Sequence, residues 1–117
     1  MNLGQLIIQL KAQKQNVMVE YDFCDFCPSG LHSWRGIYAE LALGYASKEN
    51  ISVAELLKLC EDAVGKTFEG YKGGEFVMSE NTEVHVDNYG RYSCTSITRV
   101  TSSDYACIIH TKDDQDY

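Results

Sequence analysis

Two stretches of the chain place their apolar residues on one face of a helix. In residues 2–13 these residues recur at the i, i+3, i+4 and i+7 positions, and residues 53–64 show the same spacing after Ser52 and Glu55. A serine with a glutamate three positions later forms a capping box, in which each side chain satisfies a backbone donor at the helix start. Gly65 then supplies a residue that readily takes the left-handed conformation that stops a helix. The pattern predicts two amphipathic helices, at 2–13 and 53–64.

Elsewhere apolar and polar residues alternate, which is the period of a strand with one buried face. The alternation covers residues 17–23 and again 37–45, whereas residues 24–35 between them show no period. We expect these two strands to pair antiparallel across that loop. The sequence predicts an α+β fold, with a mixed or antiparallel sheet and two amphipathic helices packed on one side. Shorter strand candidates, separated by Gly, Asn, Ser and Asp clusters, lie at 75–78, 83–87, 95–100 and 106–111.

Length and composition indicate one domain. The chain has 117 residues, of which 44% are hydrophobic and 23% charged, so it is of single-domain size and outside the disordered classes. We expect a single domain over 1–112 and an acidic tail over 113–117. No apolar run approaches the roughly 20 residues of a membrane span, and the start lacks a charged and then apolar leader. We therefore expect a cytoplasmic protein without membrane contact.

The cysteines and the charge narrow the chemistry further. Five cysteines exclude a fully paired disulfide framework within one chain, which fits a reducing compartment. Cys24 and Cys27 have the C-x-x-C spacing of zinc and redox sites, and His32 follows, but no second ligand pair closes a tetrahedral site. The plainer interpretation is two small apolar residues on a loop, so we expect no metal and no cofactor. The net charge of -7, with ten scattered basic residues, disfavours a nucleic-acid duplex as partner.

The stretch 32–40 combines the single tryptophan of the chain with an arginine, a tyrosine and a carboxylate. An arginine fork can hold a phosphate in a bidentate way, and flat aromatic rings offer stacking faces for a base. This grouping suits a nucleotide-like ligand. The candidate ligand-binding residues of this stretch are Trp34, Arg35 and Tyr38.

A second candidate stretch, 65–76, begins Gly-Lys-Thr but is not a phosphate loop. A phosphate loop needs a preceding strand and a glycine five residues before the Gly-Lys pair, whereas here a helix precedes and residue 60 is a cysteine. What remains is a glycine-rich turn that allows close approach of a ligand or of another backbone. The candidate ligand-binding residues of this turn are Tyr71, Lys72, Gly73 and Gly74.

Each candidate stretch also has a purely structural interpretation. The aromatic residues of the first stretch can fill the end of the core, while Arg35 pairs with Glu40 or Asp22. The glycine-rich turn can be a two-glycine hairpin with a solvated lysine. For catalysis, the three histidines lie in different elements, and no hydrolase, zinc-protease or paired-acid motif occurs. His85 alternates to the face opposite its neighbouring valines, as an ordinary strand residue does. We therefore expect a binding protein and not an enzyme.

Two motifs carry a family resemblance. The pattern His-Ser-Trp-Arg-Gly-x-Tyr-x-x-Leu-Ala at 32–42 and the pattern Gly-Lys-Thr-Phe-x-Gly-Tyr-Lys-Gly-Gly-x-Phe at 65–76 resemble a group of small accessory proteins encoded by tailed bacteriophages. The likeness covers residues 2–90. It implies a protein of the host cytoplasm, a setting in which small phage proteins without catalytic motifs often antagonise bacterial immunity.

The order of elements and the arginine and aromatic constellation are also similar to the signal-sponge proteins that phages use against Thoeris defence. Those proteins sequester cyclic ADP-ribose isomers, and some hold cyclic oligonucleotides. The resemblance implies a nucleotide-derived signalling molecule as partner. Because tight capture of a small ligand requires that the ligand be enclosed, we expect a pocket shared between subunits of a homo-oligomer. The alternative is an acidic protein-binding inhibitor of a host defence complex such as a CRISPR effector, acting through the acidic face and the tail.

Overall fold

Both helices form where the hydrophobic periodicity predicts them. In the computed structural model of the protein, α1 spans Leu3–Lys11 and α2 spans Val53–Ala63, and each begins with a capping box. In α2 the Ser52 hydroxyl accepts from the Glu55 N–H at 3.2 Å, and the Glu55 carboxylate accepts from the Ser52 N–H at 3.2 Å. Gly65 follows with φ +78, a left-handed conformation. The predicted cap and the predicted glycine stop of the second helix are confirmed.

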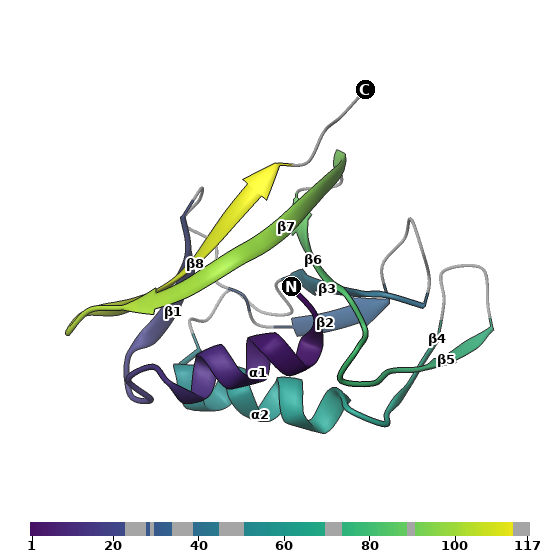
Figure 1. Cartoon of the computed structure of the whole chain (residues 1–117), viewed down its shortest axis with the longest axis horizontal. Helices are drawn as coiled ribbons and strands as arrows, with labels where there is room; N and C mark the ends of the chain where they lie inside the picture. Colours follow the sequence, from purple (N-terminus) through teal and green to yellow (C-terminus); the bar gives the residue numbers. More distant parts are fainter. Residues whose placement is uncertain are drawn as a thin grey trace.

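The structure describes residues 1–22, 28, 30–33, 39–44, 51–69, 74–88 and 91–113, without the side chains of 87, 88, 91–94 and 113. Six strands form one curled, mixed sheet in the order β1-β8-β7-β6-β3-β2, and β4 pairs with β5 in a separate hairpin (Figure 1). The pairs β1–β8 and β3–β6 are parallel, and the other neighbours are antiparallel. The predicted α+β class with a mixed sheet is confirmed. The strands are β1 Met18–Tyr21, β2 Gly30–Ser33, β3 Leu41–Gly44, β4 Thr67–Glu69, β5 Glu75–Val77, β6 Val84–Asn88, β7 Arg91–Ser102 and β8 Ala106–Asp113.

The core lies between the sheet and the two helices. α1 and α2 contact each other and lie together on one side of the sheet, α1 against β7 and α2 against β1 and β2 (Figure 1). Tyr21 lies inside this core, where its hydroxyl donates to the Leu43 carbonyl at 3.0 Å. β8, β7 and β6 lie between β1 and β3 in the sheet, so this bond connects two strands that the curl of the sheet brings close together. Fully buried residues include Leu3, Leu6 and Leu10 of α1, Val53, Leu56 and Cys60 of α2, and Val19, Leu41, Leu43, Val84, Val86 and Ile109 of the sheet.

Gln9 of α1 and Gln13, just after this helix, cover part of an edge of β7. β6 reaches β7 only as far as Ser96, so the later part of β7 has a free edge. There the Val100 N–H donates to Gln9 Oε1 at 2.8 Å, and Gln13 Nε2 donates to the Val100 carbonyl at 3.1 Å. The Ser102 hydroxyl also donates to Gln13 Oε1, at 2.8 Å. The two amides replace the missing strand partner, which protects the edge from pairing with another chain.

The predicted pairing of the first two strands is wrong. β1 pairs in parallel with β8, whereas β3 lies between β2 and β6. The strand predicted at 37–45 begins only at Leu41, after a turn that contains Ala39 and Glu40. β3 is buried on both faces and lies between two other strands, so its apolar residues do not alternate with exposed ones. β2 and β4 were not predicted at all, because strands of four and three residues are too short to establish a period.

Thr95 places a hydroxyl in the core. Its side chain is 3% exposed, and its Oγ1 has no hydrogen-bond partner within the described part of the chain. Because an unsatisfied buried hydroxyl costs about 1 to 3 kcal/mol, we expect Thr95→Val to raise the free energy of unfolding by about 1 kcal/mol. Urea denaturation followed by circular dichroism measures the change. Thr98→Val is the matched control, since the Thr98 hydroxyl donates to the His110 carbonyl at 3.2 Å and its loss should not stabilise. A loss of stability in Thr95→Val would contradict the assignment.

Candidate functional site

Each of the two segments predicted to bind ligand connects two strands that the structure describes. The first segment, residues 34–40, connects β2 to β3, and the second segment, residues 70–74, connects β4 to β5. Of the predicted ligand-binding residues, Gly74 is described, and it is exposed with φ +94, a conformation that favours glycine. The others lie outside the described residues: Trp34, Arg35, Tyr38, Tyr71, Lys72 and Gly73.

The strands that lead into the two segments lie against each other. β2 ends at Ser33, directly before the first segment, and β4 ends at Glu69, directly before the second. β2 contacts β4, and Figure 1 shows β2, β3 and the β4–β5 hairpin at the same end of the molecule. The two segments therefore start from neighbouring positions, although 35 residues lie between Ser33 and Glu69 in the chain.

The β4–β5 hairpin is fixed on the core by its aromatic residues. Phe68 and Phe76 face each other across the two strands and pack half-buried against the core. Lys66 lies over the Phe68 ring, with Nζ at 5.4 Å from the ring centre. The Gly-Lys-Thr sequence leads from α2 into β4, which is the reverse of the strand-to-helix order of a phosphate loop. The exclusion of a phosphate loop is confirmed.

The outer face of the sheet, away from the helices, carries all three histidines. They come from different strands, β2, β6 and β8, and alternate with residues that face the core. Along the sequence they lie in different elements, whereas strand pairing brings them onto one surface. The cross-strand register aligns one row of this face, made of His32, Ala42, His85, Ser96 and Lys112.

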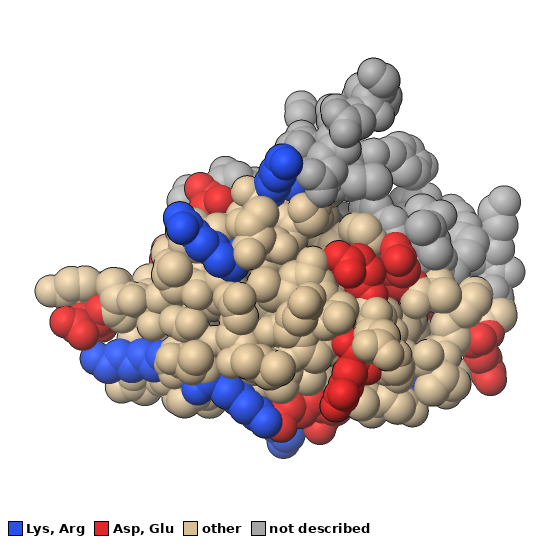
Figure 2. All heavy atoms as spheres, viewed as in Figure 1, with Lys and Arg blue, Asp and Glu red and all other residues tan. Residues whose placement is uncertain are grey.

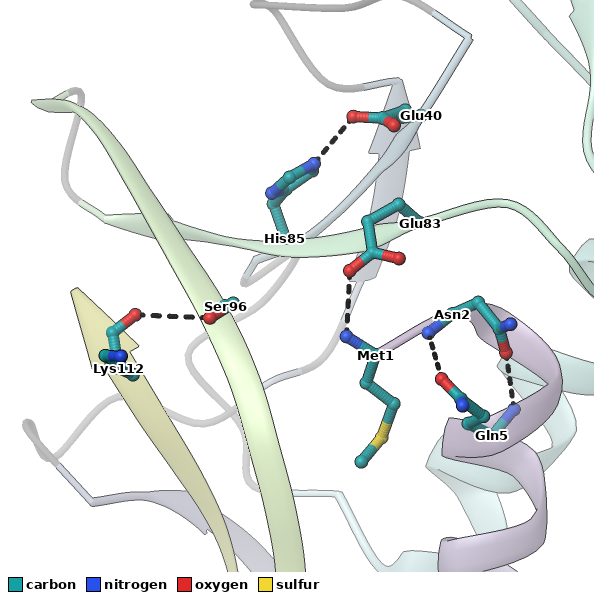
Figure 3. Close-up of polar contacts among 8 residues, drawn as sticks. All are labelled: Met1, Asn2, Gln5, Glu40, Glu83, His85, Ser96 and Lys112. Atoms are coloured by element: carbon teal, nitrogen blue, oxygen red, sulfur yellow. Dashed lines mark hydrogen bonds and ion pairs between the residues drawn. The ribbon is translucent and has the colours of Figure 1, made fainter. Parts of the chain in front are cut away.

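A short hydrogen bond joins His85 of this row to Glu40, which lies just before β3. Glu40 Oε1 is 2.7 Å from His85 Nε2 (Figure 3), and the two side chains are 26% and 15% exposed. Glu40 follows Tyr38 by two residues, so the pair lies at the end of the first segment. The sequence alone suggests Glu40 only as a structural partner for Arg35, and His85 as an ordinary strand residue. The two residues are 45 positions apart, and only the parallel pairing of β3 with β6 brings them together.

Asp22, the other carboxylate suggested as a partner for Arg35, is also engaged. Its Oδ2 accepts from the Thr111 N–H at 2.9 Å, and its Oδ1 accepts from the Thr111 hydroxyl at 2.7 Å. These bonds fasten the end of β1 to β8. Both carboxylates that could have held Arg35 structurally, Asp22 and Glu40, therefore have other partners among the described residues.

Charge is unevenly distributed over the surface. On the face shown in Figure 2, Lys and Arg lie mainly over α1, β7 and β8, whereas Asp and Glu predominate toward β4, β5 and β6. Glu69 and Glu75 are exposed cross-strand partners at the base of the β4–β5 turn. Glu83 pairs with the amino group of Met1 at 2.8 Å (Figure 3). An anionic ligand would therefore bind at this end only where Lys or Arg side chains offset the charge of these carboxylates.

The thiols of the described core are not reactive groups. Cys60 and Cys107 are buried and free of disulfides. Burial raises the pKa of the Cys60 thiol to about 12, with Glu61 adding to the rise, and burial raises the pKa of the Cys107 thiol to about 11. Both thiols are protonated at neutral pH, and the thiolate is the form that attacks and binds metals. Cys24 and Cys27 lie outside the described residues, and among the described ones no three His, Cys, Asp or Glu side chains are placed to hold a metal ion.

Two further observations bear on function. Neither of the helices in the described ranges has the length and apolar character that crossing a membrane requires. In comparisons with known proteins, no family model, no curated protein and no solved structure matches the chain. Function must therefore be inferred from the residues of this chain.

Proposed function

We propose that the protein binds and sequesters a nucleotide-type immune signal, a cyclic ADP-ribose isomer or a cyclic oligonucleotide. The contact between β2 and β4 carries this proposal, because it starts the two motif-bearing segments from neighbouring positions. One segment supplies an indole, a guanidinium and a phenol, and the other supplies a phenol, an ammonium and two glycines. Together these groups suit a ligand that has a flat base and a phosphate.

Each group has a role in this proposal. Trp34 and Tyr71 stack on the base, with Tyr38 as a further aromatic face, while Arg35 and Lys72 bind phosphate. The Gly73–Gly74 turn allows the ligand to approach the backbone closely. The engagement of Asp22 by Thr111 and of Glu40 by His85 supports the role of Arg35, because neither carboxylate depends on it.

The biological setting follows from the motif resemblance to accessory proteins of tailed phages. In that setting the protein acts in the host cytoplasm as an anti-defence protein, and sequestration requires no turnover. Nanomolar capture corresponds to about 12 kcal/mol, which an open surface does not easily supply to a small ligand. A homo-oligomer that closes the pocket between subunits supplies the missing contact area.

A thermal-shift screen tests the proposal. We expect a cyclic dinucleotide, a cyclic trinucleotide, ADP-ribose or one of its cyclic isomers to raise the melting temperature. A ligand at a hundredfold excess over its Kd adds about 2.7 kcal/mol to the free energy of unfolding, or about 10 °C for a domain of this size. Light scattering of the same sample should show an oligomer. The absence of any shift across the panel would refute nucleotide binding.

A protein-binding inhibitor is the second candidate, and the surface of the β4–β5 hairpin favours it. Val77 is 69% exposed there, beside the exposed carboxylates of Glu69 and Glu75. An apolar residue within an acidic rim suits a basic protein surface. Capture of a host protein whose affinity falls steeply with salt would support this candidate, because exposed charges are screened beyond about 8 Å at physiological ionic strength.

A further inference from the structure

The carboxylate of Glu40 is held in place by the sheet. His85 belongs to β6, an interior strand that pairs with β3 on one side and β7 on the other. Its ring is only 15% exposed and its Nε2 holds Glu40 Oε1 at 2.7 Å. Figure 3 shows His85 reaching from β6 to Glu40, which lies just before β3. A group fixed in this way before a ligand arrives loses little conformational entropy on binding.

Among the described residues, one donor reaches this carboxylate, which leaves most of its acceptor positions available. An ionised carboxylate has about four acceptor positions. Within the described residues, His85 is the one donor to Glu40, and the carboxylate is only 26% exposed. Such a group, partly removed from water, gains from any further donor that reaches it. Glu40 lies two residues after Tyr38, so it lies at the end of the segment that is proposed to hold the ligand.

The chemistry of a nucleotide limits which of its groups can approach a carboxylate. Its phosphates are anionic acceptors and are repelled. Its base presents flat faces to the aromatic residues. Its ribose hydroxyls are uncharged donors next to the phosphate, and an acidic residue that binds ribose hydroxyls is the solution that dinucleotide-binding sites use. The amino group of a base is the competing donor.

We infer that Glu40, positioned by His85, is a specificity-determining residue that accepts a hydrogen bond from a ribose hydroxyl of the ligand. The inference rests on the proposed nucleotide-binding function and narrows the ligand to ribonucleotides with a free hydroxyl. It applies equally to an ADP-ribose compound and to a cyclic dinucleotide, since both carry that group.

Isothermal titration calorimetry with matched ligand pairs tests the inference. The probes are ADP-ribose with its 2′-deoxy and 3′-deoxy analogues, and cyclic di-AMP with its 2′-deoxy analogue. We expect the wild type to lose about 10-fold or more in affinity when the hydroxyl that Glu40 binds is removed. Glu40→Gln should bind the ribose compound with a similarly reduced affinity and should no longer distinguish it from the deoxy analogue. If only the ADP-ribose set or only the cyclic di-AMP set shows this loss of discrimination in Glu40→Gln, that set identifies the class of ligand.

Glu20→Gln is the matched control. Glu20 is an exposed carboxylate on the same outer face, but on β1 at the opposite edge of the sheet. The substitution removes the same charge and should keep the preference for the ribose compound. Circular dichroism shows whether both variants are folded. If Glu40→Gln does not fold, the comparison of ribose and deoxy ligands on the wild type still tests the inference.

The possible failures are distinguishable. A wild type that binds a ribose compound and every deoxy analogue equally well would overturn the role of Glu40 and leave the proposed function intact. Equal loss for both members of a pair in Glu40→Gln would also overturn it, because Glu40 would then act on the base or only on the fold. A wild type that binds none of the probes would overturn the proposed function and this inference together.

Discussion

Replacement of Arg35 by alanine is expected to weaken nucleotide binding strongly without a change in stability. A charge-assisted hydrogen bond to phosphate contributes about 1.5 to 3 kcal/mol, so affinity should fall about 10- to 150-fold, and further if the pair is desolvated. Stability should hold because Asp22 and Glu40 are bound by Thr111 and His85 and are not left unpaired. Calorimetry and thermal unfolding measure the two effects separately.

Two further variants define what Arg35 does. Arg35→Lys keeps the charge but loses the planar fork, so a bidentate contact predicts a large loss of affinity and a simple field effect predicts a small one. Arg99→Ala removes the same charge from an exposed position on β7 and should bind normally. If Arg35→Ala instead lost about 3 to 5 kcal/mol of stability, the arginine would be the partner of a buried carboxylate. Wild-type binding and stability in Arg35→Ala would remove the residue from the site.

The helices were predictable because their signals are local. The capping box of Ser52 and Glu55 and the glycine at 65 lie within one short stretch of sequence, and the structure keeps each of them. The pairing of the strands depends on residues far apart. Val19 of β1 is the register partner of Cys107 of β8, a neighbour that no local pattern can indicate. The elements were therefore largely predictable, and their order in the sheet was not.

In the candidate site, too, clustered residues could be predicted from the sequence and residues that are far apart could not. The aromatic and basic residues of 34–38 and 71–74 stand out in the sequence because they are clustered, although the structure describes only Gly74 among those predicted to bind. The Glu40 and His85 pair had no comparable signal. An acidic residue just before an apolar run and a histidine between two valines are both ordinary alone, and the parallel pairing of β3 with β6 is what joins them. A sheet can thus place a fixed polar pair beside a loop-borne motif, as binding sites on rigid scaffolds require.

The stability of the protein is expected to fall steeply above about pH 9 because of Cys60. Burial in the core, and then the charge of Glu61, raise the pKa of its thiol from 9.0 to about 12. Between these values the unfolded chain binds fewer protons than the folded one, so the free energy of unfolding decreases as the pH rises. Below pH 9.0 the Cys60 thiol is protonated in both the folded and the unfolded chain, so this thiol causes no loss of stability there. The loss reaches about 2 kcal/mol at about pH 10.5 and about 4 kcal/mol near pH 12.

Urea denaturation of the wild type and of Cys60→Ala at several pH values measures this effect. The alanine variant carries a small packing cost at every pH, so the slopes are compared and not the absolute stabilities. We expect its free energy of unfolding to fall by about 2 kcal/mol less than that of the wild type between pH 8 and about pH 10.5. Cys107, whose pKa burial raises to about 11, is present in both proteins and cancels from the difference. Glu61→Gln removes only the second cause of the raised pKa, so it should reduce the dependence of stability on pH only slightly. Parallel curves of stability against pH for the wild type and Cys60→Ala would instead show that the Cys60 thiolate is not excluded from the folded core.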